Sequence, residues 1–100
     1  MKSDAANPRQ QLVDLIEAGQ RAAEEFRHDE AVEKLELAAR SSLLKDDPRA
    51  QVRCAWAESL EHLARYRDAL AVIAEYEVAA ARAKLSPSAL FQVWLRLGSL

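Results

Sequence analysis

The 100-residue chain has few side chains suited to catalysis: one cysteine, Cys54, and two histidines, His28 and His62. Cys54 and His62 are eight residues apart, which is about 12 Å along a helix and beyond hydrogen-bond reach. The sequence therefore does not predict a thiol nucleophile activated by this imidazole. Ser59 can share a helix face with His62, but neither an orienting acid nor an oxyanion donor accompanies the pair.

Metal and cofactor sites are not predicted either. His28 is followed by Asp29 and Glu30 in an expected turn, where helix capping is favoured because these three neighbours cannot converge on one ion. A single cysteine excludes an internal disulfide and a cysteine zinc site, and there is no glycine-rich phosphate loop. The sequence favours a protein that is not an enzyme and uses no cofactor or metal.

Composition narrows the possible partners and location. Fourteen basic and sixteen acidic residues lack the basic excess of a nucleic-acid-binding surface. No apolar run approaches the roughly 20 residues that span a bilayer, and the start "MKSDAANPRQ" has no apolar export segment. We expect a cytoplasmic protein that binds neither nucleic acid nor membrane.

Three prolines divide the chain. Each follows a residue type that caps helix N-termini, in Asn7-Pro8, Asp47-Pro48 and Ser86-Pro87, and so predicts a helix start. The prolines recur at an interval of about 40 residues, a spacing typical of repeat architectures. Weaker breaks at 26–31 and 65–70 divide each period into a helical hairpin.

Apolar residues at helical spacing predict an all-α fold, with consecutive helices as antiparallel neighbours. Trp56 and Trp94 lie in these apolar stripes and are expected in the core, whereas pairs such as Glu61 and Arg65 are expected on solvent faces. The five predicted helices are 8–25, 28–44, 48–64, 66–84 and 87–99.

Gly19 lies inside the first predicted helix, where glycine costs about 1 kcal/mol relative to alanine. A close approach of the neighbouring helix would explain it. Counted from the prolines, the matching residues are Ser59 and Gly98, which are also small. We therefore predict a seam of close helix contacts along this row.

These features resemble the tetratricopeptide repeat (TPR) family. "WLRLG" at 94–98 is similar to the opening of its motif, and Gly19 precedes Ala31 by the family's twelve residues. In the second unit Ala69 fits, but twelve residues earlier lies Ala57, whereas the proline count indicates Ser59. The spacing exceeds the family's usual interval of about 34 residues and resembles long bacterial variants. An ordinary five-helix bundle is the alternative.

The resemblance implies a TPR-like α-solenoid of stacked helical hairpins. We expect an N-terminal tail at 1–7 and a repeat domain at 8–100, with units 8–46 and 47–85 and a partial third unit at 86–100. The apolar helix of that third unit is expected either to continue into a longer array or to serve as a cap.

The resemblance also implies a non-catalytic scaffold, within a larger signalling or regulatory protein, that binds a peptide or helix of an unidentified protein partner on a concave face. In the family's chaperone-binding members a set of lysine and asparagine residues clamps a terminal carboxylate, and only Arg96 resembles that set. Partner-binding residues carried over from the family are Val13, Glu17, Gln20, Gln51, Cys54, Glu58, Glu61, Gln92 and Arg96.

A structural module that self-associates as a homodimer is the alternative function. The helix at 87–99 has more apolar residues than one buried face requires, and large exposed apolar patches usually mark interfaces. The residues expected at this contact are Leu90, Phe91, Trp94 and Leu97.

Overall fold

A computed structural model describes the backbone of residues 7–99 and the side chains of residues 7–98. Within this range every regular element is helical, which confirms the predicted all-α class. Most of the expected tail at 1–7 lies outside the described residues. The elements are α1 (Pro8–Glu24), α2 (His28–Ala39), α3 (Asp46–His62), α4 (Tyr66–Ile73), the 3-10 helix η2 (Ala74–Glu77), α5 (Ala79–Arg82) and α6 (Pro87–Ser99).

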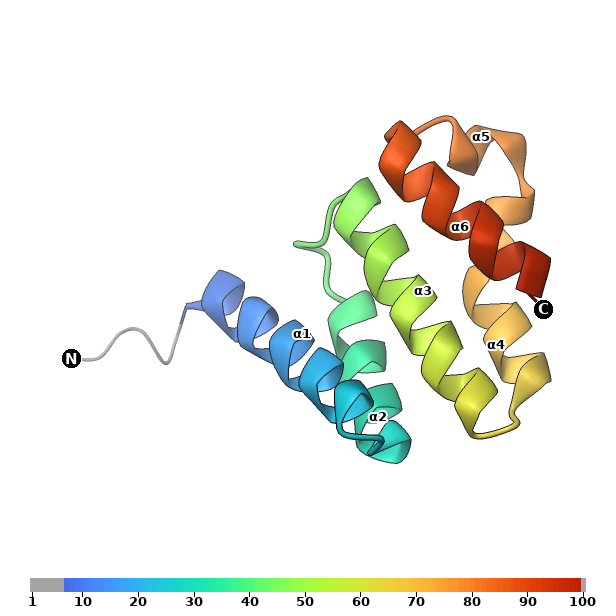
Figure 1. Cartoon of the computed structure of the whole chain (residues 1–100). Coiled ribbons are helices and arrows are strands. Elements are labelled where there is room, and N and C mark those ends of the chain that lie inside the picture. Colours follow the sequence, from blue (N-terminus) through green and yellow to red (C-terminus); the bar gives the residue numbers. More distant parts are fainter. Residues whose placement is uncertain (1–6, 100) are drawn as a thin grey trace.

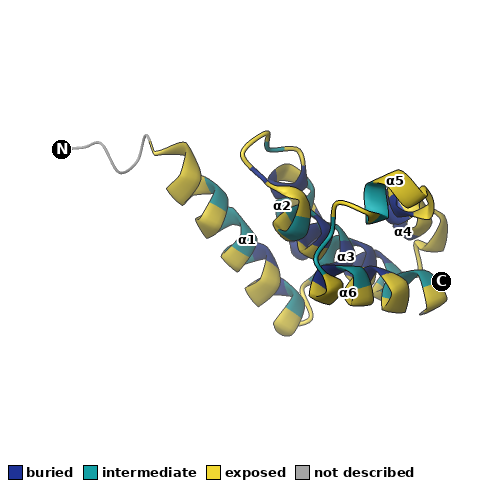
Figure 2. Ribbon diagram, turned by 90° about the horizontal axis from the view of Figure 1, so that it is seen from above, coloured by how far each residue is buried: buried dark blue, intermediate teal, exposed yellow. Residues whose placement is uncertain are grey.

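The helices form two layers. In both overall views α1, α3 and α6 lie on one side of the molecule, and α2 and α4 lie on the other (Figure 1, Figure 2). Helices adjacent in sequence pack against each other, from α1 with α2 to α3 with α4, and α6 packs on α3. The short connections make each successive pair antiparallel, as predicted.

The core consists of two apolar clusters, one around Leu35 within the first hairpin and the other around Leu60 and Ile73 in the second. Trp56, which was expected in the core, is partly buried and packs against both clusters, so it lies where the two hairpins meet. Burial of large apolar side chains in this way is the main source of stability in a small helical domain.

Two of the three predicted helix caps are confirmed. The Asn7 side chain accepts hydrogen bonds from the N–H groups of Arg9 and Gln10, and Ser86 Oγ accepts one from the Ala89 N–H group. The cap predicted at Asp47 is wrong, because α3 begins two residues earlier than the proline indicates. Asp47 instead accepts a hydrogen bond of 2.9 Å from the Ser86 N–H group and so ties α3 to the start of α6.

The earlier start of α3 decides which residue of the second hairpin corresponds to Gly19. Phe26 and Ala64 are the only described non-glycine residues with positive φ, and each lies two residues after the last residue of the first helix of its hairpin. Each is followed by an N–H group that bonds back over the turn, from Arg27 to Ala22 and from Arg65 to Leu60. Counted back from these two turns, the partner of Gly19 is Ala57, and the proline-based match to Ser59 is wrong.

The predicted seam is confirmed at Gly19 but not at Gly98. A Cβ atom on Gly19 would lie 2.8 Å from Leu35 Cγ, so α2 packs directly over this glycine. Ala57, at the same place in α3, is fully buried. A Cβ atom on Gly98 would have nothing within 4 Å, because no described helix covers that side of α6.

The second helix of each hairpin is shorter than predicted. The helix expected at 28–44 ends at Ala39, and the chain turns so that Leu44 is buried in the first cluster. Arg49 stabilises this turn by donating a hydrogen bond of 2.9 Å to the Leu44 carbonyl oxygen. Tertiary burial thus ends the helix where no glycine or proline does.

The single helix predicted at 66–84 is also wrong. It breaks after Ile73 into η2 and α5, with Tyr76 buried in the second cluster. Two arginines satisfy carbonyl groups at the break: Arg53 donates to the Val72 oxygen at 2.7 Å, and Arg82 donates to the oxygens of Tyr76 and Glu77. These bonds replace the helical hydrogen bonds that the break removes.

Candidate binding groove

A concave surface crosses the layer formed by α1, α3 and α6. Three open hollows, of about 470, 380 and 250 Å³, follow one another from α1 across α3 to α6, and Glu58 lines all three. We call this continuous surface the α1–α3–α6 groove. Its lining residues are Glu17, Gln20, Arg21, Ala23, Glu24, Gln51, Cys54, Ala55, Glu58, Glu61, His62, Tyr66, Gln92, Leu95 and Arg96.

Eight of the nine residues predicted to bind a partner line this groove. The exception is Val13, which is exposed on α1 but does not line any of the three hollows. Glu24 and Tyr66 line the groove although the motif positions did not include them. Both lie near the hairpin turns, beyond the first-helix positions that the family resemblance implies for partner binding.

The groove carries more negative than positive charge. Its lining includes four glutamates and two arginines. Arg96 is partly buried and forms ion pairs with Glu61, at 2.5 Å, and with Glu58, at 3.6 Å. Because two carboxylates of α3 already balance this guanidinium, the groove does not present a cationic clamp for a terminal carboxylate.

Uncharged polar groups lie between these charges. Gln20 from α1, Gln51 from α3 and Gln92 from α6 line the same hollow of about 380 Å³. Each amide can donate and accept hydrogen bonds, as a peptide group requires. The three side chains thus offer a bound polypeptide backbone partners from three separate helices.

Cys54 lies in the wall of that hollow, almost completely buried. Burial raises the pKa of its thiol to about 11. The thiol therefore stays protonated at neutral pH, and the thiolate is the form that attacks electrophiles and binds metals. Among the described residues, no group of three or more histidine, cysteine or acidic side chains could hold a metal ion.

Sequence reasoning missed a histidine cluster between the hairpins. His28 Nδ1 lies 3.3 Å from Ser59 Oγ, and the rings of His28 and His62 are stacked with centroids 4.4 Å apart. Because Ser59 is only 1% exposed, its hydroxyl cannot meet a substrate, and the contact joins α2 to α3. His28 and Ser59 are 31 residues apart, so no local spacing pattern could indicate the bond.

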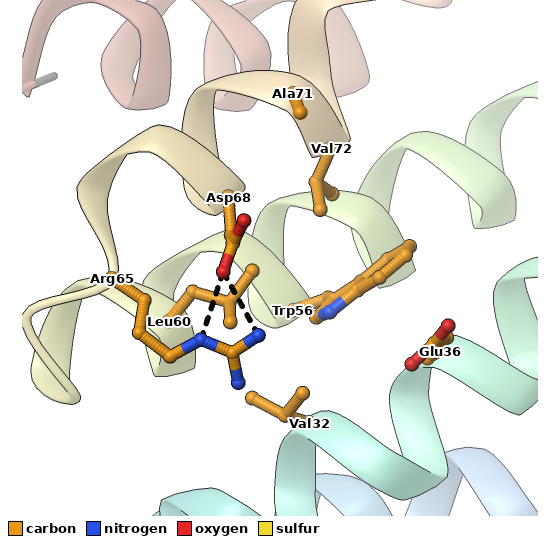
Figure 3. A pocket seen from close by; sticks show the side chains of 8 residues that line it. All are labelled: Val32, Glu36, Trp56, Leu60, Arg65, Asp68, Ala71 and Val72. Atoms are coloured by element: carbon orange, nitrogen blue, oxygen red, sulfur yellow. Dashed lines mark hydrogen bonds and ion pairs between the residues drawn. The ribbon is translucent and has the colours of Figure 1, made fainter.

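A separate pocket of about 290 Å³ lies between α2, α3 and α4 (Figure 3). Val32, Trp56 and Val72 supply apolar walls, and the ion pair of Arg65 with Asp68 lies at the rim. The buried Trp56 Nε1 has no hydrogen-bond partner. The pocket is a gap between the second helices of the two hairpins.

An uncovered and strongly apolar side of α6 borders the groove at Leu95. Phe91 is 63% exposed, Leu95 is 56% exposed and Trp94 is 50% exposed, so the expectation that Trp94 belongs to the core is wrong. The Arg82 guanidinium lies over the Trp94 ring, 4.9 Å from its centroid. Of the other residues expected at a self-association contact, Leu90 is half-buried and Leu97 packs against the second core cluster.

None of the described helices is both long and apolar enough to cross a membrane. Comparison with models of known protein families, with curated proteins and with solved structures finds no match to this chain.

Proposed function

We propose that the chain is a non-catalytic scaffold that binds a segment of a protein partner in the α1–α3–α6 groove. One observation carries this proposal: residues as far apart as Glu17, Glu58 and Arg96 line one continuous concave surface. A groove built from three rigid helices can recognise an extended segment at several points along its length. The proposal includes a TPR-like arrangement, in which the first helix of each unit lines the binding face.

Internal repetition supports the TPR-like assignment. In both hairpins a residue with left-handed backbone conformation occupies the turn, Phe26 in the first and Ala64 in the second. A small residue lies seven positions before each of them, at Gly19 and Ala57. Repeats of this kind stack through neighbouring hairpins and leave one layer of helices facing the ligand.

Charge defines the partner more closely. The excess of glutamates favours a segment with lysine or arginine side chains, while the three glutamines suit its peptide groups. Glu17 and Glu24, both exposed on α1, lie on the side of the groove away from Arg96. We therefore expect the basic side chains of the partner to bind nearest to α1.

Selection from a displayed library of random peptides of about twelve residues tests this proposal, because such a peptide spans up to about 40 Å when extended. Enriched peptides are expected to be basic and to bind less tightly as salt increases. Binding should weaken about tenfold in Glu17→Arg, which corresponds to about 1.4 kcal/mol.

Glu33→Arg is the matched control, because it makes the same charge change at an exposed position of α2 in the other layer. Its affinity for the selected peptides should equal that of the wild type. Equal losses in Glu17→Arg and Glu33→Arg, or a selection without basic residues, would refute recognition in this groove.

A second candidate function is self-association as a homodimer. The exposed side chains of Phe91, Trp94 and Leu95 on α6 favour it, because contiguous apolar patches on monomers commonly mark interfaces. Phe91 and Trp94 do not line the groove, whereas Leu95 also lines its hollow of about 380 Å³, so the two surfaces meet at Leu95.

A further inference from the structure

The apolar side of α6 has the spacing of a helix-packing face. Phe91, Trp94, Leu95 and Gly98 follow one another at intervals of three, one and three residues, and all four are exposed. Residues with this spacing lie along one side of a helix. We call these four residues the α6 outer face.

The first two units show what covers an equivalent face. Gly19, Ala57 and Gly98 each lie eleven residues after the first residue of their helix, at Pro8, Asp46 and Pro87. Gly19 is covered by Leu35 from the antiparallel helix α2, and Ala57 is fully buried. Only Gly98 is open. The α6 outer face thus has the form of a surface to which an antiparallel helix packs, with a large apolar side chain over the glycine.

We propose that the α6 outer face binds the same face of a second copy of this chain, with the two α6 helices antiparallel across a two-fold axis. In this register Phe91 of each copy lies over Gly98 of the other, and Trp94 lies against Leu95. Phe91, the most exposed large apolar side chain of α6, and the open position Gly98 are seven residues apart, so the two-fold pairing places each against the other at both ends of the contact. Two-fold pairing of identical faces is the commonest form of oligomer.

Charge favours a second copy over a charged partner. The α6 outer face has no ionisable residue, and the nearby Arg96 is already paired with Glu58 and Glu61. The Arg82 guanidinium lies over the Trp94 ring and can remain there at the edge of the contact. The charge that a second copy brings to the edge of the contact is therefore its own Arg82, and no carboxylate is left without a partner.

The size of the face sets the expected strength. A half-exposed aromatic side chain leaves about 100 Å² uncovered, so Phe91, Trp94 and Leu95 together supply about 300 Å² per copy. Stable complexes bury about 800 Å² per partner. We therefore expect a weak, reversible dimer with a dissociation constant of about 100 µM.

Sedimentation velocity of the whole chain, from about 5 µM to about 500 µM, tests the proposal because this range brackets the expected dissociation constant. The sedimentation coefficient should rise from that of a monomer to that of a dimer. Phe91→Ala should weaken association at least tenfold. Leu37→Ala, at an exposed apolar position of α2, is the control and should leave it unchanged.

Gly98→Leu distinguishes association in the proposed register from non-specific hydrophobic association. The monomer has room for the new side chain, so circular dichroism and the melting temperature should show an intact fold. In the proposed register the leucine meets Phe91 of the second copy, so association should be lost. If apolar area alone drives association, the same change strengthens it and overturns the proposal.

Exchanging the two residues completes the test. The double variant Phe91→Ala with Gly98→Phe again places a large side chain against a small one, and it should dimerise more strongly than Gly98→Phe alone. A wild-type chain that remains monomeric at about 500 µM refutes the inference. Glu17→Arg, which alters only the groove, should dimerise normally, so failure of the dimer and failure of peptide binding can be told apart.

Discussion

The two hairpins begin alike and end differently. In both, the first helix has 17 residues and is followed two residues later by a left-handed residue, Phe26 or Ala64. After that turn α2 continues for 12 residues, whereas α4 stops after 8 and gives way to η2 and α5. The repeated part is the turn and the contact beneath it, while the outer end of the second helix varies.

This difference shows which contacts determine each part. The turns are local, because each is closed by N–H groups that bond back to the preceding helix. The break in α4 depends on residues outside that helix: Arg53 of α3, 19 residues from Val72, and Arg82 of α5 donate hydrogen bonds to the carbonyl groups near it. Local hydrogen bonds therefore form the turn in both hairpins, and contacts from other elements shape the chain after α4.

The largest effect is expected where the hairpins meet. Trp56 contacts both core clusters, whereas the corresponding residue of the first helix is Ala18. Trp56→Ala should lower the free energy of unfolding by about 3 kcal/mol, because it removes a large side chain between two packed units. Denaturant unfolding followed by circular dichroism measures this loss.

Trp94→Ala is the matched control, because it removes the same side chain from a half-exposed position. It should cost less than about 1 kcal/mol at protein concentrations where the chain is a monomer. Equal losses at the two tryptophans would show that Trp56 does not hold the hairpins together.

A somewhat smaller effect is expected from filling the small positions. Gly19→Leu forces a side chain into the space occupied by Leu35 and should destabilise the fold by about 2 kcal/mol. Gly98→Leu meets no neighbour in the monomer and should be neutral or stabilising by up to about 1 kcal/mol, because leucine favours a helix more than glycine does. Thermal melting of both variants compares a covered glycine with an open one. Similar melting temperatures would contradict the difference in packing between Gly19 and Gly98.

Relief of strain at the turns should have a smaller effect of opposite sign. Ala64 has φ of 60°, a region that costs a non-glycine residue about 1 kcal/mol or more. Ala64→Gly should therefore stabilise the chain by up to about 1 kcal/mol, and Phe26→Gly should act in the same direction. Ala71→Gly, inside α4, is the control and should destabilise by about 1 kcal/mol. Loss of stability in Ala64→Gly would contradict the shared turn.

The helices and most of the groove were predictable because their signals are periodic. Apolar spacing located the first helices, and motif positions identified groove residues such as Gln20 and Glu58. The pairing of Glu61 was not predictable: local spacing suggested Arg65, but the structure pairs it with Arg96, 35 residues away. Asp47 was misassigned for the same reason, since its partner Ser86 is 39 residues distant.

The smallest effect is expected at Asp47, whose hydrogen bond with Ser86 joins α3 to the start of α6. No described residue of the first hairpin makes a corresponding bond. The Ser86 N–H group donates a hydrogen bond to the Asp47 carboxylate and lowers its pKa below the usual value of about 3.9. A carboxyl group whose pKa is lowered by folding stabilises the folded state above its unfolded pKa, and this contribution is lost as pH falls through the folded pKa. The wild type should therefore lose more stability than Asp47→Asn between about pH 5 and about pH 2, as measured by denaturant unfolding. Asp46→Asn, which alters the neighbouring exposed carboxylate at the first residue of α3, is the control. If Asp47→Asn and the wild type lose stability in parallel, the bond between α3 and the start of α6 does not form in solution.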